Sequence, residues 1–184
     1  MTKGIYKQQM MRKEKVPPKE AQDRVERWLW DEETLRVFVD CSELKEQGIF
    51  GIGVIFVGQG TTMVKSKKHY NQSMKKMNIY AELVAVEFAL TQLDKIWDVD
   101  FHLPSRIIVY SDWNKIEKLN RTTMISKRHL PMNTIAERIN ERKLHFSKSH
   151  PTVELSISYM NEGQKRYNPF YMASHNASRK AIGI

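Results

Sequence analysis

Three acidic residues occur at points in the chain where the surrounding pattern is apolar. Asp40 ends the run 35–40, which is rich in β-branched and aromatic residues, and Asp112 ends the apolar run 106–112. Glu82 lies between them in a segment whose apolar residues have helical spacing. Carboxylates are rarely buried unless they are paired or bind a metal ion. The chain must therefore fold so that two strand ends and one helix give these acids a partner.

The hydrophobic pattern predicts an α/β domain. Strands are expected over 35–40, 51–57, 62–70, 106–112 and 153–159, and helices over 19–33, 78–96, 113–119, 133–146 and 169–182. Short connections with glycines predict an antiparallel meander for the first three strands. The run 106–112 is apolar enough for a central strand covered on both faces, and Asn78 is expected to cap its helix. This order predicts a mixed five-stranded sheet flanked by helices.

Length and composition set the domain organisation. The chain has 184 residues, enough for one domain with its own core. We expect a basic N-terminal arm with a short helix over residues 1–33 and the main domain over 34–184. No stretch is long and apolar enough for a membrane span, and the first residues lack the apolar core of a signal peptide. With a single cysteine, Cys41, these features predict a cytoplasmic protein with no membrane partner.

The charge balance bears on the partner. Thirty Lys and Arg against 21 Asp and Glu give a formal net charge of +9. An excess of this size favours an anionic partner such as nucleic acid, although a generally basic protein has the same composition. Basic residues cluster in the first 30 residues, at Lys127–His129, and at Arg138, Arg142 and Lys143. Either phosphate contacts or solvated surface charge would account for them.

Convergence of the three acids would require a cation. Carboxylates in one place repel one another, which raises their pKa values unless a cation lies between them. Oxygen ligands favour hard cations, and Mg²⁺ uses one or two carboxylates while waters and phosphate oxygens complete its shell. Two such ions about 4 Å apart can activate a water and stabilise the leaving oxygen of a phosphodiester. The acids therefore predict hydrolysis of a nucleic-acid backbone with two Mg²⁺ ions, for which Mn²⁺ could substitute.

Each acid also has an ordinary structural explanation. Asp40 could begin a turn, Glu82 could pair with Lys76 or face solvent, and Asp112 could cap the helix that follows it. These explanations account for the acids one at a time. A shared site is favoured only because all three acids occur together, two at strand ends and one on the helix between them in the sequence.

Two short segments resemble the ribonuclease H family. They are Asn78-Ile-Tyr-Ala-Glu82-Leu-Val-Ala85 and Tyr110-Ser-Asp112, and the strand that ends in Asp40-Cys-Ser42 precedes them in the same order. The likeness covers about residues 35–181. It implies a ribonuclease H-like fold, with Asp40, Glu82 and Asp112 as ligands of two Mg²⁺ ions. It also implies cleavage of the RNA strand of an RNA/DNA hybrid, with Ser42 and Asn78 near the cut site.

The last helix departs from the commonest pattern of that family. Many members carry a fourth aspartate at the position of His175 in this chain. Some divergent branches of the family, which this chain resembles, have a histidine there instead. We expect His175 to ligate or position a metal ion or to assist product release, with an ordinary surface histidine as the alternative. The loop expected over 160–168 also lacks the histidine that many relatives have there, which predicts slow turnover.

These observations support three functions. The first is a metal-dependent endoribonuclease acting on RNA/DNA hybrids, with Asp40, Glu82, Asp112 and His175 as catalytic and metal-binding residues. Asp40 and Asp112 would hold the ion on the nucleophile side, and Glu82 would share the second ion and its water. The second function is a non-catalytic nucleic-acid-binding module on the same fold. The third is a nuclease or recombinase acting on DNA or structured RNA.

Overall fold

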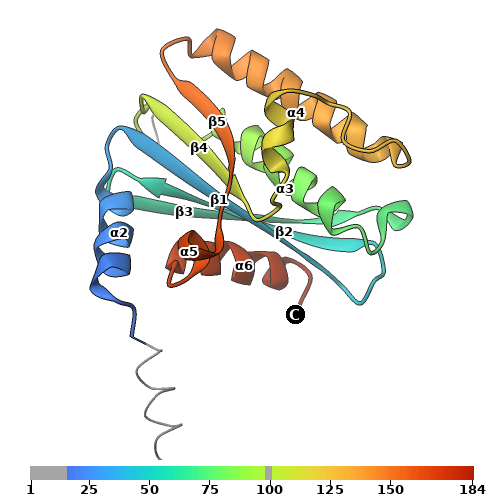
Figure 1. Ribbon diagram of the computed structural model, residues 1–184, viewed down its shortest axis with the longest axis horizontal. Coiled ribbons are helices and arrows are strands. Elements are labelled where there is room, and N and C mark those ends of the chain that lie inside the picture. The colour runs from blue at the N-terminus through green and yellow to red at the C-terminus, as the bar shows by residue number, and fades with distance from the viewer. Residues whose placement is uncertain (1–15, 98–100) are drawn as a thin grey trace, which may run out of the picture.

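The computed structural model describes residues 16–97 and 101–184 (Figure 1). Residues 1–15 of the N-terminal arm, which was expected with its short helix over residues 1–33, lie outside these ranges. The helices are α2 (Lys19–Trp30), α3 (Asn78–Leu93), α4 (Leu130–Ser149), α5 (Glu162–Lys165) and α6 (Pro169–Ala181), with 3₁₀ turns η1 (Gln72–Met74) and η2 (Ile116–Asn120). The strands are β1 (Thr34–Glu43), β2 (Ile49–Gly58), β3 (Thr61–Tyr70), β4 (Arg106–Ser111) and β5 (Glu154–Tyr159).

One mixed sheet in the order β3-β2-β1-β4-β5 organises the molecule. Strands β1, β2 and β3 form the expected antiparallel meander, whereas β4 pairs parallel to both β1 and β5. The register places Phe38 opposite Tyr110. Asp40 and Asp112 each follow that pair by two residues, so the two aspartates lie side by side. Asp112 comes directly after the end of β4, and Asp40 lies within β1, opposite Gly53 of β2.

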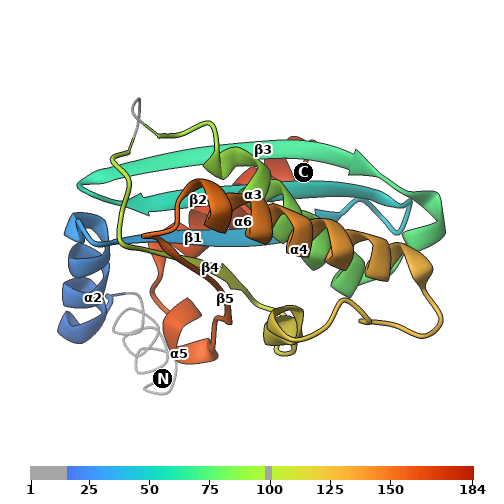
Figure 2. The same cartoon turned by 90° about the horizontal axis from the view of Figure 1, so that it is seen from above.

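Helices cover both faces of the sheet (Figures 1 and 2). On one face α3 packs against β1 and β2 with α4 beside it, around a core that includes Val37, Ile52 and Leu83. On the other face α6 lies across β1, β2 and β3. A smaller core there gathers around Phe38 and Phe170. Each face therefore has its own apolar layer, as an amphipathic helix on a sheet requires.

Two glycines let α6 approach the sheet closely. A Cβ at Gly51 would lie 1.8 Å from the carbonyl oxygen of Ser178, and one at Gly53 would lie 2.0 Å from that of Ser174. No side chain fits at such distances, so only glycine allows the α6 backbone to rest on β2. This contact brings the side chains of α6 to the level of Asp40.

Helix α2 docks on the face that α6 covers. Trp28 of α2 packs on Phe38 with ring centroids 5.5 Å apart, and Val25 and Leu29 join the same core. The aromatic contact shows that Trp28 faces the domain. None of the helices in the described residues is long and apolar enough to cross a membrane.

Several element boundaries differ from the prediction. The cap of α3 is Met77 and Asn78 is the first helical residue, so the expectation that Asn78 caps this helix is wrong. The expected helix 113–119 is the later 3₁₀ turn η2, capped by Lys115, because Ser111 Oγ accepts the Trp113 N–H at 3.3 Å. Asp112 is thus no helix cap. Burial alternates along β4, so β4 is not fully covered on both faces.

One helix is longer than predicted, and one short helix was not predicted at all. Helix α4 begins at Leu130 because Pro131 fits its first turn. Helix α5 is a single turn in the predicted loop 160–168, and a capping box between Asn161 and Gln164 stabilises it.

Candidate active site

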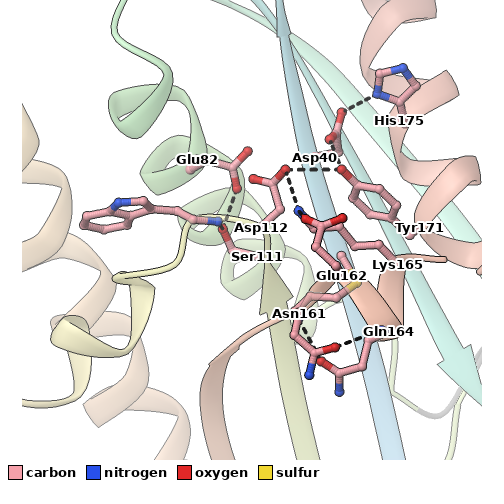
Figure 3. Close-up of polar contacts among 12 residues, drawn as sticks. Asp40, Glu82, Ser111, Asp112, Asn161, Glu162, Gln164, Lys165, Tyr171 and His175 are labelled. Carbon is pink, nitrogen blue, oxygen red and sulfur yellow. Dashed lines mark hydrogen bonds and ion pairs between the residues drawn. The ribbon is translucent and has the colours of Figure 1, made fainter.

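The three acids predicted from the sequence face one region (Figure 3). An open pocket of about 280 Å³ is lined by Glu82 and Asp112 together with Asn78 and Lys165. Asp40 reaches the same region from β1, because the Tyr171 hydroxyl lies 3.4 Å from Asp40 Oδ1 and 3.2 Å from Asp112 Oδ2. The parallel pairing of β1 with β4 and the packing of α3 on β1 create this convergence.

Glu82 is a buried acid held by two donors. Its side chain projects from α3 toward the sheet, and the residue is 5% exposed. Ser111 Oγ donates a hydrogen bond to Oε2, and Cys41 Sγ donates to Oε1 at 3.1 Å. Ser111 is the last residue of β4 and precedes Asp112, and Cys41 follows Asp40 within β1. Glu82 is therefore neither solvent-facing nor paired with Lys76, which instead contacts Glu46 at 2.6 Å.

Asp112 lies beside a cation. Lys165 Nζ of α5 is 3.4 Å from Asp112 Oδ2 and 3.2 Å from Glu162 Oε1. Burial alone would lower the pKa of Lys165, but the negative charges of Asp112 and Glu162 outweigh it and raise that pKa. Lys165 therefore stays protonated at neutral pH. Among the described residues that line the pocket, Lys165 is the one cation, and the other charged side chains are Glu82, Asp112 and Glu162.

Asp40 is held from the α6 side. His175 Nδ1 lies 3.2 Å from Asp40 Oδ2, and the Ser178 hydroxyl donates to the same oxygen at 2.9 Å. Ser42 Oγ lies 2.9 Å from Ser178 Oγ and extends this chain. The structure thus brings His175 to Asp40, with 38% of the His175 side chain still exposed, and it places Ser42 behind Asp40 through Ser178.

Burial makes it unfavourable for Glu82 and Asp40 to carry their negative charges. Burial raises the pKa of Glu82 to about 8, and the nearby charge of Asp112 adds to this effect, although the bonds from Ser111 and Cys41 oppose it. Burial also raises the pKa of Asp40, against the opposing contacts with Ser178 and His175. Desolvation disfavours the charged form of a carboxyl group, and a like charge nearby has the same effect. A bound cation would relieve both penalties.

The donor set fits a hard divalent cation. Over residues 16–97 and 101–184, no three His, Cys, Asp or Glu side chains are already arranged to hold a metal ion. The acids nevertheless present oxygens toward one region, and burial disfavours their charges in the absence of a cation. Carboxylate oxygens of this kind suit Mg²⁺ or Mn²⁺. Asp40, Glu82 and Asp112 are the residues that would hold such an ion.

The predicted basic cluster on α4 is partly neutralised. Arg138 Nε lies 3.0 Å from Glu87 Oε1 on α3, and Arg142 Nε lies 3.9 Å from the same atom. Lys143 Nζ donates to Asn120 Oδ1 at 2.9 Å. Part of this charge therefore fastens α4 to its neighbours rather than facing solvent alone.

Sequence reasoning missed the residues that contact the acids. Cys41 and Ser111 adjoin predicted acids in the sequence, and that proximity was an available signal. Tyr171 and Ser178 fall four residues before and three after His175, on the same helical face. Lys165 had no such signal, because a loop was expected where α5 forms.

Comparison with known proteins bears on the fold. No family model matches the chain, and no curated protein matches it. Among solved structures, a ribonuclease H1 isolated from compost by a metagenomic approach is 18% identical, with a TM-score of 0.55 over 82% of this chain and 99% of that one. Ribonuclease H1 from Halobacterium salinarum is 15% identical, with a TM-score of 0.53 over 81% and 97%.

A third similar structure is the N-terminal ribonuclease H domain of a Mycobacterium tuberculosis protein. It is 11% identical, with a TM-score of 0.53 over 79% of this chain and 98% of that one. The sheet order 3-2-1-4-5 and the flanking helices agree with these structures. The chain therefore has the ribonuclease H-like fold.

Proposed function

We propose that this protein is a metal-dependent endoribonuclease that hydrolyses the RNA strand of RNA/DNA hybrids. The observation that carries the proposal is the meeting of Asp40 on β1, Asp112 just after the parallel strand β4, and Glu82 on the helix across them. At this place burial raises the pKa of Asp40 and Glu82. Perturbed acids that converge at a pocket are a common mark of a functional site.

The acids would hold two Mg²⁺ ions. Bound ions of this kind polarise the phosphate and generate a nucleophilic water. Asp40 and Asp112 would bind on the nucleophile side and Glu82 on the other. His175 would favour the ionised form of Asp40 through its 3.2 Å contact, which opposes the effect of burial on the pKa of Asp40. Ser178 would keep Asp40 in place, with Ser42 behind it.

The substrate would enter over the exposed first turn of α3. Asn78 is exposed there and lines the pocket beside Glu82 and Asp112, where its amide can contact a sugar or phosphate of the hybrid. The ribonuclease H-like fold and the net charge of +9 agree with a nucleic-acid substrate. A protein that tells RNA from DNA does so through the 2′-hydroxyl.

One observation favours a second candidate, a non-catalytic nucleic-acid-binding module. Lys165 and His175 contact Asp112 and Asp40, so two of the three acids have partners on the protein itself. Such a module would bind hybrids with a steep salt dependence and would not cut them.

Cleavage assays separate the two candidates. Labelled RNA/DNA hybrid, duplex RNA, duplex DNA and single strands are incubated with Mg²⁺ or Mn²⁺, with Asp112→Asn alongside. We expect hybrid-selective cutting that the variant loses while its circular dichroism spectrum is unchanged. Undiminished cutting by Asp112→Asn would refute the proposed site, and binding without cutting by the unmodified protein would favour the module.

A further inference from the structure

Lys165 is a cation built into the acidic pocket. Its side chain is only 16% exposed, and Nζ lies 3.4 Å from Asp112 Oδ2 and 3.2 Å from Glu162 Oε1 (Figure 3). The ammonium also lies 5.9 Å from the centre of the Tyr171 ring. Half-buried lysines are costly unless they are paired. Lys165 is therefore not an ordinary solvated surface lysine, and its place beside Asp112 suggests a role in the site.

The chain holds Lys165 there from two directions. The capping box of α5 joins Asn161 and Gln164, which fixes the single turn that ends at Lys165. From α2, Arg24 donates to the carbonyl oxygens of Gly163 at 3.0 Å and Arg166 at 2.9 Å. These carbonyls flank Lys165 in the sequence. The N-terminal helix thus anchors the turn that carries the cation.

We propose that Lys165 is a substrate-binding residue that pairs with Asp112 in the free protein and contacts a phosphate of the nucleic-acid strand in the complex. This inference rests on the proposed function. Three carboxylates without a cation would repel a phosphodiester, and an ammonium among them offsets part of that repulsion. The lysine side chain is flexible, and its three donors can serve a carboxylate and a phosphate in turn.

The same pairing has a consequence for metal binding. A divalent cation at Asp112 must either share that carboxylate with the Lys165 ammonium or displace it. Like charges at this separation oppose each other, most strongly where water is partly excluded. Lys165 should therefore weaken metal binding in the free protein while it strengthens the interaction with substrate. Loss of the lysine should move these two properties in opposite directions.

The test uses Lys165→Met in the full chain, with Lys180→Met as the matched control. Lys180 is exposed in the last turn of α6, and its substitution removes the same charge. Calorimetric titration with MnCl₂ in the absence of nucleic acid should show about three- to tenfold tighter binding for Lys165→Met. Hybrid cleavage at saturating metal should slow by about tenfold or more, because a donor to the phosphate is lost. Lys180→Met should leave both values near those of the unmodified protein.

The outcomes separate this role from a structural one. If Lys165 only stabilised the pocket, its loss would weaken both metal binding and cleavage, and that result would overturn the proposal. Unchanged Mn²⁺ affinity, or cleavage equal to that of Lys180→Met, would also overturn it. Lys165→Arg keeps the charge, so it should retain weak metal binding and recover most of the cleavage rate. This second variant covers the case in which the methionine disturbs α5.

Failure of the proposed function would be recognised separately. If the unmodified protein cuts no substrate, hybrid affinity measured without metal replaces the cleavage rate. A loss of affinity in Lys165→Met beyond that in Lys180→Met would still support the phosphate contact. Equal losses in the two variants would reject it.

Discussion

Glu82 illustrates how one residue can link the site to the stability of the whole fold. Burial raises its pKa from 4.5 to about 8 in the folded chain, so the folded state keeps a proton that the unfolded state loses. Stability falls with pH wherever the unfolded state binds fewer protons. We therefore expect the metal-free protein to lose stability, by up to a few kcal/mol, as pH rises from about 4.5 to about 8.

Glu82→Gln provides the comparison. The amide cannot ionise and keeps an oxygen for the bond from Ser111, so urea unfolding between pH 5 and 8 should show a flatter profile than the unmodified protein. Glu20→Gln changes an exposed acid of α2 and should keep the original slope. A Glu82→Gln profile as steep as that of the unmodified protein would show that another group carries the dependence.

At the same scale, the sequence pattern predicted that the three acids lie together, but it did not predict which side chains contact them. An acid within an apolar run is visible in the sequence because it breaks a pattern. Cys41, Ser111 and Tyr171 break no pattern, since a small or aromatic residue suits a buried or half-buried position. Their roles depend on which atoms meet after folding, and the register of β1 with β4 and the packing of α6 decide that.

The contact between α6 and β2 is the element-scale feature that fixes the site. Gly53→Ala would place a methyl group 2.0 Å from the backbone oxygen of Ser174, so α6 must move away from the sheet. Overpacking of this kind costs about 1–3 kcal/mol or more. We expect urea unfolding to show that loss together with a weaker hold of Ser178 and His175 on Asp40.

Gly58→Ala is the graded comparison for that prediction. Its Cβ would meet Thr34 O at 3.2 Å and Asp31 O at 3.3 Å, distances that small shifts can relieve. Its cost should be clearly smaller than that of Gly53→Ala. Equal costs would mean that loss of glycine itself, rather than the close approach of α6, determines the effect.

A second element-scale link joins α2 to α5. Arg24→Met removes the bonds to the carbonyls of Gly163 and Arg166, so the turn that carries Lys165 loses its outer anchor. Hydrogen exchange of the amides in residues 163–166 should accelerate, because local opening becomes easier. Arg27→Met, one turn along on the exposed side of α2, should leave those amides unchanged. Equal protection in both variants would show that the capping box alone holds α5.

On the scale of the whole molecule, the sequence pattern predicted the arrangement of strands and main helices but not the short turns. Alternating and helical periodicities are set by the same burial that forms the two cores, so all five strands and the main helices were predictable. Boundaries such as the start of η2 depend on single hydrogen bonds such as that from Trp113 N–H to Ser111 Oγ. Helix α5 depends on a capping box four residues long, which is too short for any periodicity to reveal.

Net charge is the whole-molecule property that should govern nucleic-acid binding. Arg138 and Arg142 share the single carboxylate of Glu87, which neutralises part of their charge, so exposed lysines elsewhere are candidates for further phosphate contacts. Lys115 and Lys118 are exposed around η2 and line a hollow that shares Asn114 with the acidic pocket. A strand that reaches Asp112 would pass close to them. We infer that this pair contributes phosphate contacts.

The salt dependence of hybrid binding measures those contacts. Each phosphate contact adds about 0.9 to the slope of log affinity against log salt, so the double variant Lys115→Met/Lys118→Met should lower the slope by about two. Lys19→Met/Lys180→Met removes the same charge from exposed positions on α2 and α6 and should lower it by much less. Fluorescence anisotropy across a salt series, with metal withheld to prevent cleavage, gives both slopes. Similar reductions would show that net charge, rather than a path over η2, sets the attraction, because a diffuse field does not distinguish between the two pairs of lysines.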